Sequence, residues 1–371
     1  MRTMNFMRHD SGIMEYEEVK KGLAGVIVDN TAIASTDSNG TLIYRGYAAE
    51  ELAEKSTFEE VAYLVVYGHL PNKKELLKFS NLLNRNSRVP QNINKIMKLL
   101  PRNTPAIDVL RSMVSLMPLN GDENDGKLLE IAAKIPRIIS DWHRLSKGSA
   151  PLRGTAETYA ERFYYLLTGN KSKSDARLLE ELLILYMEHE FNASTFTLRV
   201  AASTLTDPQA AMTAALAAIK GPLHGGANAE ILDYLLPMKS TPEARKYVDG
   251  KLRKKEKIMG FGHRIYKNKD PRAQYLKERL RGLAAAKGAE KLYNIAVAIE
   301  DEMWKMKNIP ANMDFYAAIC MYLMKIDSSL NTPIFAASRS FGWTAHYLEQ
   351  VSNNKLIRPS SRYIGMLGMH L

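Results

Sequence analysis

Four polar–proline pairs in the second half of the chain constrain its fold more than any other sequence feature. Each pair precedes a run of helix-forming residues; the pairs are Asp207-Pro208, Thr241-Pro242, Asp270-Pro271 and Thr332-Pro333. A short polar side chain can cap the free N–H groups of a first helical turn, where the missing N–H of proline costs nothing. Ser56 and Thr57 stand three residues before Glu59 and Glu60, which is the spacing of a capping box. We therefore predict an all-α fold.

Residues 25–47 are the exception to this helical pattern. The segment alternates β-branched and polar residues around the turn sequence Ser38-Asn39-Gly40. Such alternation on both sides of a turn favours a hairpin. We predict a small N-terminal antiparallel β element. Further along, the glycine clusters at 221–226 and 260–262 are the best hinge candidates, because glycine tolerates unusual backbone angles.

The composition is that of an ordinary globular protein. The chain has 371 residues, of which 46% are hydrophobic and 25% charged. Its longest apolar runs fall well short of the roughly 20 residues that a membrane helix needs. The first ten residues lack the apolar core of a signal peptide. Cys320 is the single cysteine, which excludes an intrachain disulfide and a cysteine metal cluster. We expect a cytoplasmic protein.

The net charge of +11 arises from 51 Lys and Arg residues against 40 Asp and Glu residues. A basic balance suits nucleic acid, an anionic membrane surface or a small polyanion, and charge alone does not choose among them. A basic run at residues 251–257 leads into the second glycine cluster and continues beyond it. Most such runs are solvated helix faces. Because the run at residues 251–257 adjoins a glycine segment, it is also a natural binding site for a polyphosphate tail.

Three of the eight histidines have unusual neighbours. His189 lies in EHEFNAST at the end of an apolar run, His224 lies between glycines in GPLHGGAN, and His263 follows glycines in MGFGHRIYKNKDPRA. Glycine beside a polar side chain indicates a close backbone approach to a ligand, although a simple turn explains any single case better. The other five histidines, His346 among them, have unremarkable surroundings.

Several site classes are poor matches to the sequence. HEFNA is not a HExxH zinc motif, because Ala193 occupies the position of the second histidine. The chain has no GxSxG nucleophile motif and no GxxxxGK[ST] phosphate loop. GFGHRI lacks the third glycine of a dinucleotide fingerprint and does not follow a convincing strand. We expect no bound metal.

What remains is histidine, aspartate and arginine chemistry, which suits proton transfer and carboxylate binding. Asp314 stands in the cap or first turn of an apolar helix. Arg339 lies among small and apolar residues, where an unpaired charge is costly. Arg272 and Arg358 either lie on the surface or bind carboxylates in two-point contacts through their guanidinium groups.

Taken together, these segments resemble the citrate synthase family, which includes 2-methylcitrate synthases. EHEFNAST, GPLHGGAN, MGFGHRIYKNKDPRA, the Asp314 helix, SRSFGW and IRPSS occur in the order and spacing of that family, from about Gly22 onward. The compact length is similar to that of its bacterial and archaeal dimeric branch.

The resemblance implies a role for each residue. His224 would stabilise the enol of an acyl-CoA thioester, Asp314 would remove its proton, and His263 would contact the oxaloacetate carbonyl. Oxaloacetate would be held by His189, Arg272, Arg339 and, from the second subunit, Arg358. Coenzyme A would contact Lys257, Gly260, Arg264 and Lys267.

The resemblance also implies an architecture. A large domain would span residues 1–219 and return at 323–371, and a small domain with the coenzyme A and catalytic segments would span 220–322. The protein would be a homodimer without cofactors, since the coenzyme A thioester is a substrate. Membrane and nucleic acid are not expected partners.

Two features leave the acyl substrate open. Asp314 is followed by FYAA where many relatives have Ser-Gly, and HEFNAST is more similar to the 2-methylcitrate branch. One methylene changes discrimination by only about 1–3 kcal/mol. We expect acetyl-CoA to condense with oxaloacetate to give citrate, with propionyl-CoA or dual specificity as the alternative. A non-catalytic nucleic-acid-binding protein is the hypothesis from another class, but the chain has no recognisable binding motif for it.

Overall fold

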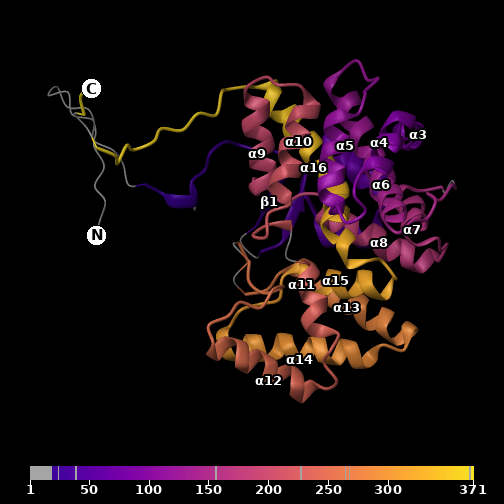
Figure 1. Cartoon of the computed structure of the whole chain (residues 1–371), viewed down its shortest axis with the longest axis vertical. Helices are drawn as coiled ribbons and strands as arrows, with labels where there is room; N and C mark the ends of the chain where they lie inside the picture. The colour runs from indigo at the N-terminus through magenta and orange to yellow at the C-terminus, as the bar shows by residue number, and fades with distance from the viewer. Residues whose placement is uncertain are drawn as a thin grey trace.

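The structure is a computed structural model that describes residues 19–23, 25–37, 40–154, 157–225, 228–263, 265–266, 268–366 and 369–371. The described residues form sixteen α-helices and one small sheet (Figure 1). The prediction of an all-α fold with a small N-terminal β element is confirmed. None of the described helices is long and apolar enough to cross a membrane.

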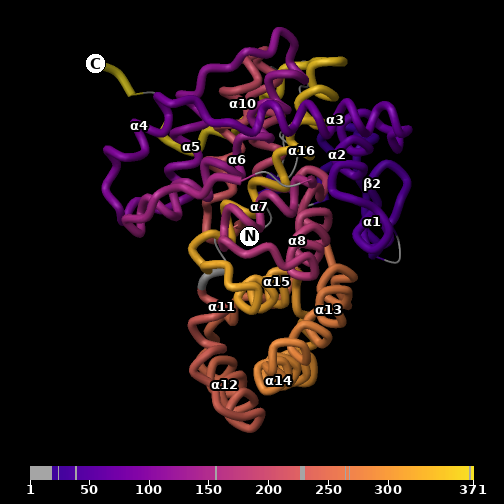
Figure 2. The backbone as a smooth tube through the Cα atoms, turned by 90° about the vertical axis from the view of Figure 1, so that its right-hand side faces the viewer, coloured from indigo at the N-terminus to yellow at the C-terminus, as the bar shows by residue number. Residues whose placement is uncertain are grey.

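The helices fall into two groups in space, one above the other in Figures 1 and 2. The upper group comprises α1 (Ala49–Lys55), α2 (Phe58–Tyr67), α3 (Lys73–Asn86), α4 (Gln91–Leu99), α5 (Ala106–Leu116), α6 (Asn124–Ser146), α7 (Tyr159–Thr168), α8 (Lys173–Tyr186), α9 (Ala193–Ser203), α10 (Pro208–Ile219) and α16 (Asn331–Ser352). The lower group comprises α11 (Asn228–Leu235), α12 (Thr241–Arg253), α13 (Pro271–Lys287), α14 (Glu290–Lys307) and α15 (Met313–Leu323).

Helix α16 is the centre of the upper group. It packs against α2, α6, α8, α9 and α10. Its side chains are buried almost without interruption from Pro333 to Tyr347, and they include Phe341 and Trp343. Burying a large apolar side chain stabilises a fold by about 1.5–3 kcal/mol. The last helix of the chain therefore supplies much of the core around which the earlier helices are arranged.

All four predicted helices are present, and two of the four predicted caps are confirmed. Asp207 caps α10 and Asp270 caps α13, each with proline in the first turn. Helix α12 also begins at Thr241-Pro242, but its capping side chain is Ser240, one residue earlier. The capping box of Thr57 and Glu60 at the start of α2 is confirmed as well.

The predicted cap at Thr332 is wrong. Helix α16 begins one residue earlier, at Asn331, directly after the 3-10 helix Ser328–Leu330, and no side chain caps it. Because the two helices run into each other, the polar cap is not required. The Thr332 hydroxyl instead donates a hydrogen bond to the Gly225 carbonyl at 2.7 Å, in the glycine segment that follows α10.

The predicted β element is a three-stranded antiparallel sheet in the order β1 (Ala34–Thr36), β2 (Leu42–Tyr44) and β3 (Tyr47–Ala48). Ser35 pairs with Ile43 across the first two strands. The turn residues Ser38 and Asn39 lie outside the described residues. Tyr44, fully buried, places its hydroxyl 3.0 Å from the Glu188 carbonyl and 3.2 Å from those of Ile184 and Leu185. The sheet thus supports the end of α8.

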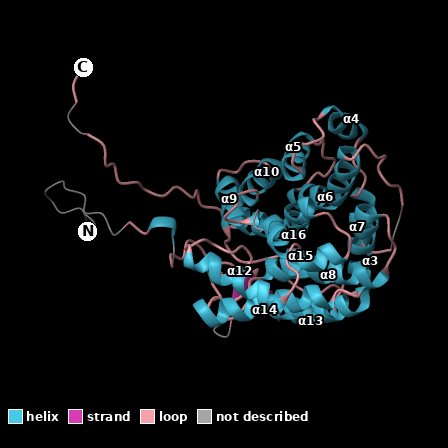
Figure 3. Cartoon of the chain, turned by 60° about the horizontal axis from the view of Figure 1, so that its bottom comes forward, coloured by secondary structure: helices cyan, strands magenta, loops and turns pink. Residues whose placement is uncertain are grey.

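The chain after α16 leaves the helical body as an extended segment (Figure 3). This segment begins near Asn353, has no regular secondary structure where it is described, and is mostly exposed. Tyr363 and Ile364 are among its exposed apolar side chains. This C-terminal arm, from Asn353 onward, therefore buries little surface against its own chain.

Candidate active site

A cavity of about 770 Å³ lies where the two groups of helices meet. It is lined from the upper group by the segment between α8 and α9 and by α16, and from the lower group by the residues before and at the start of α15. Seven of the residues predicted from the sequence line it: His189, His224, Gly260, His263, Arg272, Asp314 and Arg339. Residues up to 150 positions apart in sequence are therefore brought to one place.

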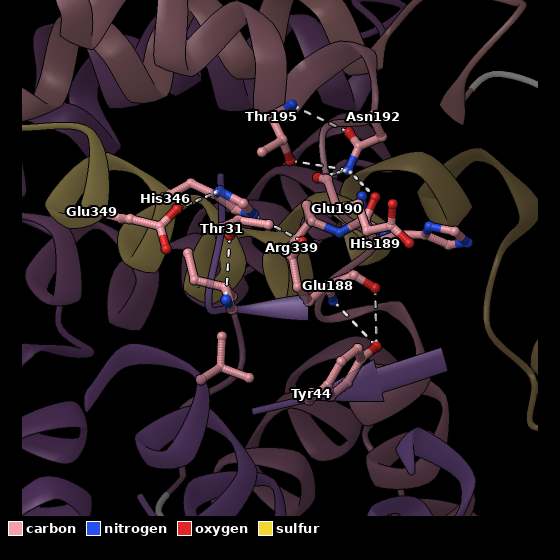
Figure 4. Close-up of polar contacts among 12 residues, drawn as sticks. Thr31, Tyr44, Glu188, His189, Glu190, Asn192, Thr195, Arg339, His346 and Glu349 are labelled. Carbon is pink, nitrogen blue, oxygen red and sulfur yellow. Dashed lines mark hydrogen bonds and ion pairs between the residues drawn. The ribbon is translucent and has the colours of Figure 1, made fainter. Parts of the chain in front are cut away.

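Asn192 shapes the EHEFNAST segment (Figure 4). It caps α9 by accepting a hydrogen bond from the Thr195 N–H at 3.2 Å, and its amide donates to the Thr195 hydroxyl at 2.9 Å. Its amide also lies 3.3 Å from the His189 carbonyl. These bonds turn the chain sharply between α8 and α9, and the turn presents His189 to the cavity.

His189 is a buried imidazole with an unsatisfied ring atom. It is 7% exposed, and its Nε2 has no hydrogen-bond partner among the described residues. Burial, followed by the charges of Arg272, His263 and Arg339, lowers the pKa of His189 well below its usual value. The ring is therefore neutral, and a buried polar atom without a partner is costly unless a ligand satisfies it.

His224 is held by Ser194, the second residue of α9. The Ser194 hydroxyl lies 2.8 Å from Nε2 of His224. Burial, assisted by the charge of Arg339, lowers the pKa of His224 to about 4. A neutral imidazole carries a single ring proton, so His224 can offer one N–H to a substrate oxygen near neutral pH.

His263 has a defined tautomer because two backbone N–H groups point at the same ring nitrogen. The N–H groups of Ile265 and Tyr266 lie 3.2 and 3.3 Å from Nδ1. Nδ1 therefore accepts, and the proton of the neutral ring resides on Nε2. The ring stacks on Tyr266 with centroids 4.6 Å apart, and it lies 5.1 Å from the ring of His189.

Asp314 is half-buried in the first turn of α15, where Asn312 is the cap. The same Asn312 donates from its backbone to the Gly260 carbonyl at 2.9 Å and from its side chain to the Gly262 carbonyl at 3.1 Å. The glycine segment before His263 is thus bonded to the start of α15. Consequently, His263 and Asp314 are held by one local structure.

Tyr186 was not identified from the sequence. Its hydroxyl donates a hydrogen bond to Oδ1 of Asp314 at 2.9 Å, and its ring packs on Phe335 with centroids 4.6 Å apart. The residue lies at the end of α8 and lines the same cavity. A hydroxyl in this position orients the carboxylate and stabilises its charge.

Arg272 is a buried cation that already has a partner. Its guanidinium forms a two-point ion pair with Asp270, at 3.0 Å for Nε–Oδ1 and 2.9 Å for Nη2–Oδ2. Although burial alone would lower the pKa of Arg272, the Asp270 carboxylate raises it. Asp270 also accepts from the Met313 N–H at 3.1 Å. The cap of α13 therefore fixes both Arg272 and the start of α15, a role that its position in the sequence did not reveal.

Arg339 is a buried cation without an ion-pair partner among the described residues. It is 2% exposed, its Nε donates to the Tyr186 carbonyl at 2.8 Å, and its guanidinium lies 4.7 Å from the centre of the Phe335 ring. No carboxylate of the described residues forms an ion pair with it, although Glu188 acts on it from a distance. Burial lowers the pKa of Arg339. An anionic ligand in the cavity would offset this desolvation.

His346, which its sequence surroundings left unremarkable, belongs to a fully buried network with Glu188, the residue before His189 (Figure 4). Arg199 approaches its Nδ1 at 3.1 Å, and its Nε2 lies 2.9 Å from Oε1 of Glu188. Because arginine only donates, Nδ1 accepts and Nε2–H donates to Glu188. Glu188 directly precedes His189, so the network fixes the backbone from which that imidazole projects.

The residues expected to contact coenzyme A are only partly described. Gly260 lines the cavity with a φ of 88°, and an added Cβ there would contact Phe315 at 3.0 Å. Lys257 is exposed. Arg264 and Lys267 lie outside the described residues. Within the basic run, Lys251 pairs with Glu256 and Arg253 with Asp249, so part of its charge is neutralised.

Arg358 does not reach the cavity of its own chain. It is exposed on the extended segment after α16 and is not among the residues that line the cavity. The described residues contain no group of three histidine, cysteine, aspartate or glutamate side chains arranged to hold a metal ion.

The cavity combines three kinds of chemistry. Asp314 is a carboxylate that can accept a proton, His224 and His263 can each donate one N–H, and Arg339 is a cation in need of an anion. A site with a base, two neutral hydrogen-bond donors and a buried guanidinium suits the removal of a proton next to a carbonyl in the presence of an anionic second substrate.

Comparison with known proteins agrees with this chemistry. The family model for the citrate synthase C-terminal domain matches residues 22–360. The chain is 42% identical over 356 residues to the 2-methylcitrate synthase of Shewanella oneidensis, covering 93% of this chain and 94% of that relative. It is also 42% identical over 357 residues to citrate synthase 2 of Bacillus subtilis, covering 93% and 95%.

Solved structures extend the likeness to three dimensions. The citrate synthase of Thermotoga maritima superposes with a TM-score of 0.87 at 40% identity, covering 95% of this chain and 98% of that one. The Thermoplasma acidophilum enzyme, solved with carboxymethyl coenzyme A and oxaloacetate, superposes with a TM-score of 0.88 at 32% identity and the same coverage. This chain belongs to the citrate synthase family, and it is an acyltransferase that converts the acyl group into an alkyl group on transfer.

Proposed function

We propose that this enzyme condenses acetyl-CoA with oxaloacetate and water to give citrate and coenzyme A. The observation that carries the proposal is the convergence of His224, His263 and Asp314 on one cavity that Arg339 also lines. The carboxylate base and the imidazole donors suit a thioester. The arginine, which has no ion pair among the described residues, suits a keto-diacid.

Oxaloacetate would occupy the arginine side of the cavity. One of its carboxylates would pair with Arg339, which has no ion-pair partner among the described residues. The other would share Arg272 with Asp270, and Nε2 of His189 would gain the hydrogen bond that it lacks. Each contact satisfies a group that is costly to bury alone, so binding energy is available to position the ketone.

Asp314 would remove a proton from the acetyl methyl group. That proton is very weakly acidic, so the developing enolate oxygen needs a donor nearby, which His224 would supply. This role requires the Ser194 hydroxyl to donate to Nε2 of His224 and not to Oδ1 of Asn192, which also lies 2.8 Å from it. The one ring proton of His224 would then reside on Nδ1 and be available to the thioester oxygen. The Tyr186 hydroxyl would keep the carboxylate aligned during the transfer.

The enol carbon would then attack the ketone carbon of oxaloacetate. A new carbon–carbon bond forms, the carbonyl π electrons move to its oxygen, and Nε2–H of His263 protonates the alkoxide. The product of this step is still a thioester. Water cleaves it, giving a carboxylate and the free thiol of coenzyme A. Domain closure about the glycine segments would exclude water until this last step.

Coenzyme A would act as a substrate group, and the reaction as written requires no cofactor. Its phosphates would lie toward the end of the basic run, at Lys257 and beyond, and its chain would pass Gly260, where the absence of a Cβ leaves room. The complex of the Thermoplasma acidophilum relative with a coenzyme A derivative and oxaloacetate supports this choice of ligands.

The proposal includes a cytoplasmic homodimer in which Arg358 completes the active site of the second subunit. Two observations support it: Arg358 does not line the cavity of its own chain, and the arm that carries it extends away from the helical body (Figure 1). A guanidinium on such an arm can reach the carboxylate of a substrate bound elsewhere.

A second candidate is 2-methylcitrate synthesis from propionyl-CoA. It is favoured by HEFNAST, while the identity of 42% is the same to a 2-methylcitrate synthase and to a citrate synthase. The rings of Tyr186 and Phe335 line the cavity together with Asp314. One additional methyl group changes the free energy of transition-state binding by only about 1–3 kcal/mol. Small differences in the residues that line the cavity next to Asp314 therefore decide which acyl-CoA is preferred.

The deciding experiment compares the two acyl donors. Purified enzyme is mixed with oxaloacetate and either acetyl-CoA or propionyl-CoA, and release of the coenzyme A thiol is followed by colour. We expect kcat/KM for acetyl-CoA to be at least about tenfold higher. A ratio in the opposite direction would establish the second candidate instead, and turnover of neither donor would refute both.

A further inference from the structure

A second cavity, of about 990 Å³, lies in the upper group of helices and shares no lining residue with the active site. It is bounded by α3, α4, α6, α7 and the segment between α6 and α7, which lie together toward the right of Figure 3. The reaction proposed above makes no use of it.

The walls of this cavity are strongly basic. Four arginines line it, Arg88, Arg137, Arg153 and Arg162, and no aspartate or glutamate is among its described lining residues. Arg137 is neutralised by Asp141, with Nε 2.9 Å from Oδ2. The other three form no ion pair with a carboxylate in the described part of the chain. Three arginines without an ion pair among the described residues therefore line one hollow.

Arg162 is the most unusual of the three, because it is 8% exposed. Its guanidinium lies 5.8 Å from the centre of the Tyr159 ring, and Nη1 donates to the side chain of Asn84, which also lines the cavity. Burial lowers the pKa of Arg162, and Tyr159 and Glu59 only partly oppose this effect. One amide oxygen cannot satisfy five N–H donors, so the remaining donors are available to a ligand in the cavity.

We propose that this cavity binds a small molecule that carries two or more phosphate groups. Arg88, Arg153 and Arg162 line the hollow from three different segments of the chain: after α3, between α6 and α7, and within α7. A single carboxylate satisfies one guanidinium fork, whereas linked phosphates offer oxygens to several forks at once. Asn84 and Asn94 add uncharged hydrogen-bonding groups to the same wall.

The test uses inorganic tripolyphosphate as the probe and full-length protein at about 0.15 M ionic strength, where weak surface attraction is largely screened. Binding is measured by titration calorimetry and by the rise in melting temperature that a ligand selective for the folded state produces. The double variant Arg88→Gln/Arg153→Gln removes two exposed cationic groups from the cavity, so it is expected to fold and to melt like wild type without the probe.

The matched control is Arg85→Gln/Lys98→Gln, which removes the same charge from exposed positions of α3 and α4 that do not line the cavity. We expect the cavity variant to bind tripolyphosphate at least about tenfold more weakly than wild type and the control to bind like wild type. Equal binding by wild type and the cavity variant would place the probe elsewhere, for example on residues 251–257, and would overturn the proposal, as would a wild-type protein that binds none.

Discussion

His189 and His224 are held neutral by the same two causes, burial and neighbouring arginines. A protonated imidazole would repel Arg339 and would lose solvation, so the charged form is doubly disfavoured. The protein therefore uses its interior to keep hydrogen-bond donors uncharged next to cations. This neutrality has a measurable effect on stability as well as a role in the proposed reaction.

The effect on stability follows from the pKa of His224, which is about 4 in the folded protein against 6.5 for the reference side chain. Between these values the unfolded chain binds the proton and the folded chain does not, so stability is lost as pH falls from 6.5 toward 4. We expect His224→Asn to lose less stability than wild type between about pH 7.5 and pH 5. Urea midpoints at the two pH values measure this, and equal losses would contradict it.

Asp314→Asn tests the assignment of the base. The variant keeps the shape of the side chain and can still contact Tyr186, but it cannot take a proton, so we expect kcat to fall about 10²- to 10⁴-fold. Binding of oxaloacetate, measured by calorimetry, should change little. Asp301→Asn, at an exposed position of α14, is the control with the same charge change. Near-normal turnover in Asp314→Asn would remove this residue from the mechanism.

Sequence context identified the residues that line the cavity better than it identified the residues that hold them in position. His224 and His263 stand out because glycines flank them, and Arg339 because small and apolar residues surround it. Tyr186 and His346 have no such signal. Their partners, Asp314 and Glu188, lie 128 and 158 positions away, and only the folded chain brings them together.

At the scale of structural elements, α16 approaches the end of α8 closely. Gly342 of α16 faces the Met187 carbonyl and the Glu188 carboxylate, and an added Cβ would overlap both. Since Glu188 and Arg339 contribute to the cavity and its supports, this approach of two helices sets the spacing of the site. Nothing in the sequence SRSFGW separates such a glycine from one that merely weakens a helix.

Two glycine substitutions test this interpretation. Gly342→Ala should destabilise the protein by about 1–3 kcal/mol and lower activity, because the backbone of the α8 end must move to admit a methyl group. Gly282→Ala, in α13 with open space around it, should instead stabilise the protein by about 0.5–1 kcal/mol. Chemical denaturation measures the change in unfolding free energy of each variant. Changes of the same sign in both variants would contradict this interpretation.

Helix boundaries show where local sequence rules hold. Asp207 and Asp270 cap helices through hydrogen bonds within a few residues, so their positions are readable from the sequence. At α12 the cap is Ser240, one residue before the predicted position. The prediction of a cap at Thr332 is wrong because α16 continues directly from a 3-10 turn. The Thr332 hydroxyl instead donates to the carbonyl of Gly225, 107 positions away. Rules for caps describe local competition for backbone groups, and tertiary contacts override them.

At the scale of the whole molecule, the proposed dimer makes a quantitative prediction. In a dimer of one Asp314→Asn subunit and one Arg358→Ala subunit, one site would lack both residues and the other would be intact. Random mixing makes about half of all dimers mixed, so co-expression should restore about one quarter of wild-type activity.

The readout is turnover by the co-expressed pair against each variant expressed alone. Restored activity requires that Arg358 act across the interface, because each homodimer lacks one of the two groups in both sites. Activity no higher than the average of the two homodimers would mean that the arm serves its own subunit or no site.

The central position of α16 also has a consequence for biosynthesis. A ribosome releases this helix last, yet α2, α6, α8, α9 and α10 all pack against it. Until nearly the entire polypeptide has emerged, those partners display apolar surface that has nothing to cover it, so the nascent chain depends on chaperones or rapid completion to avoid aggregation. Messages truncated before Asn331 should therefore yield insoluble product that no shorter folded fragment replaces.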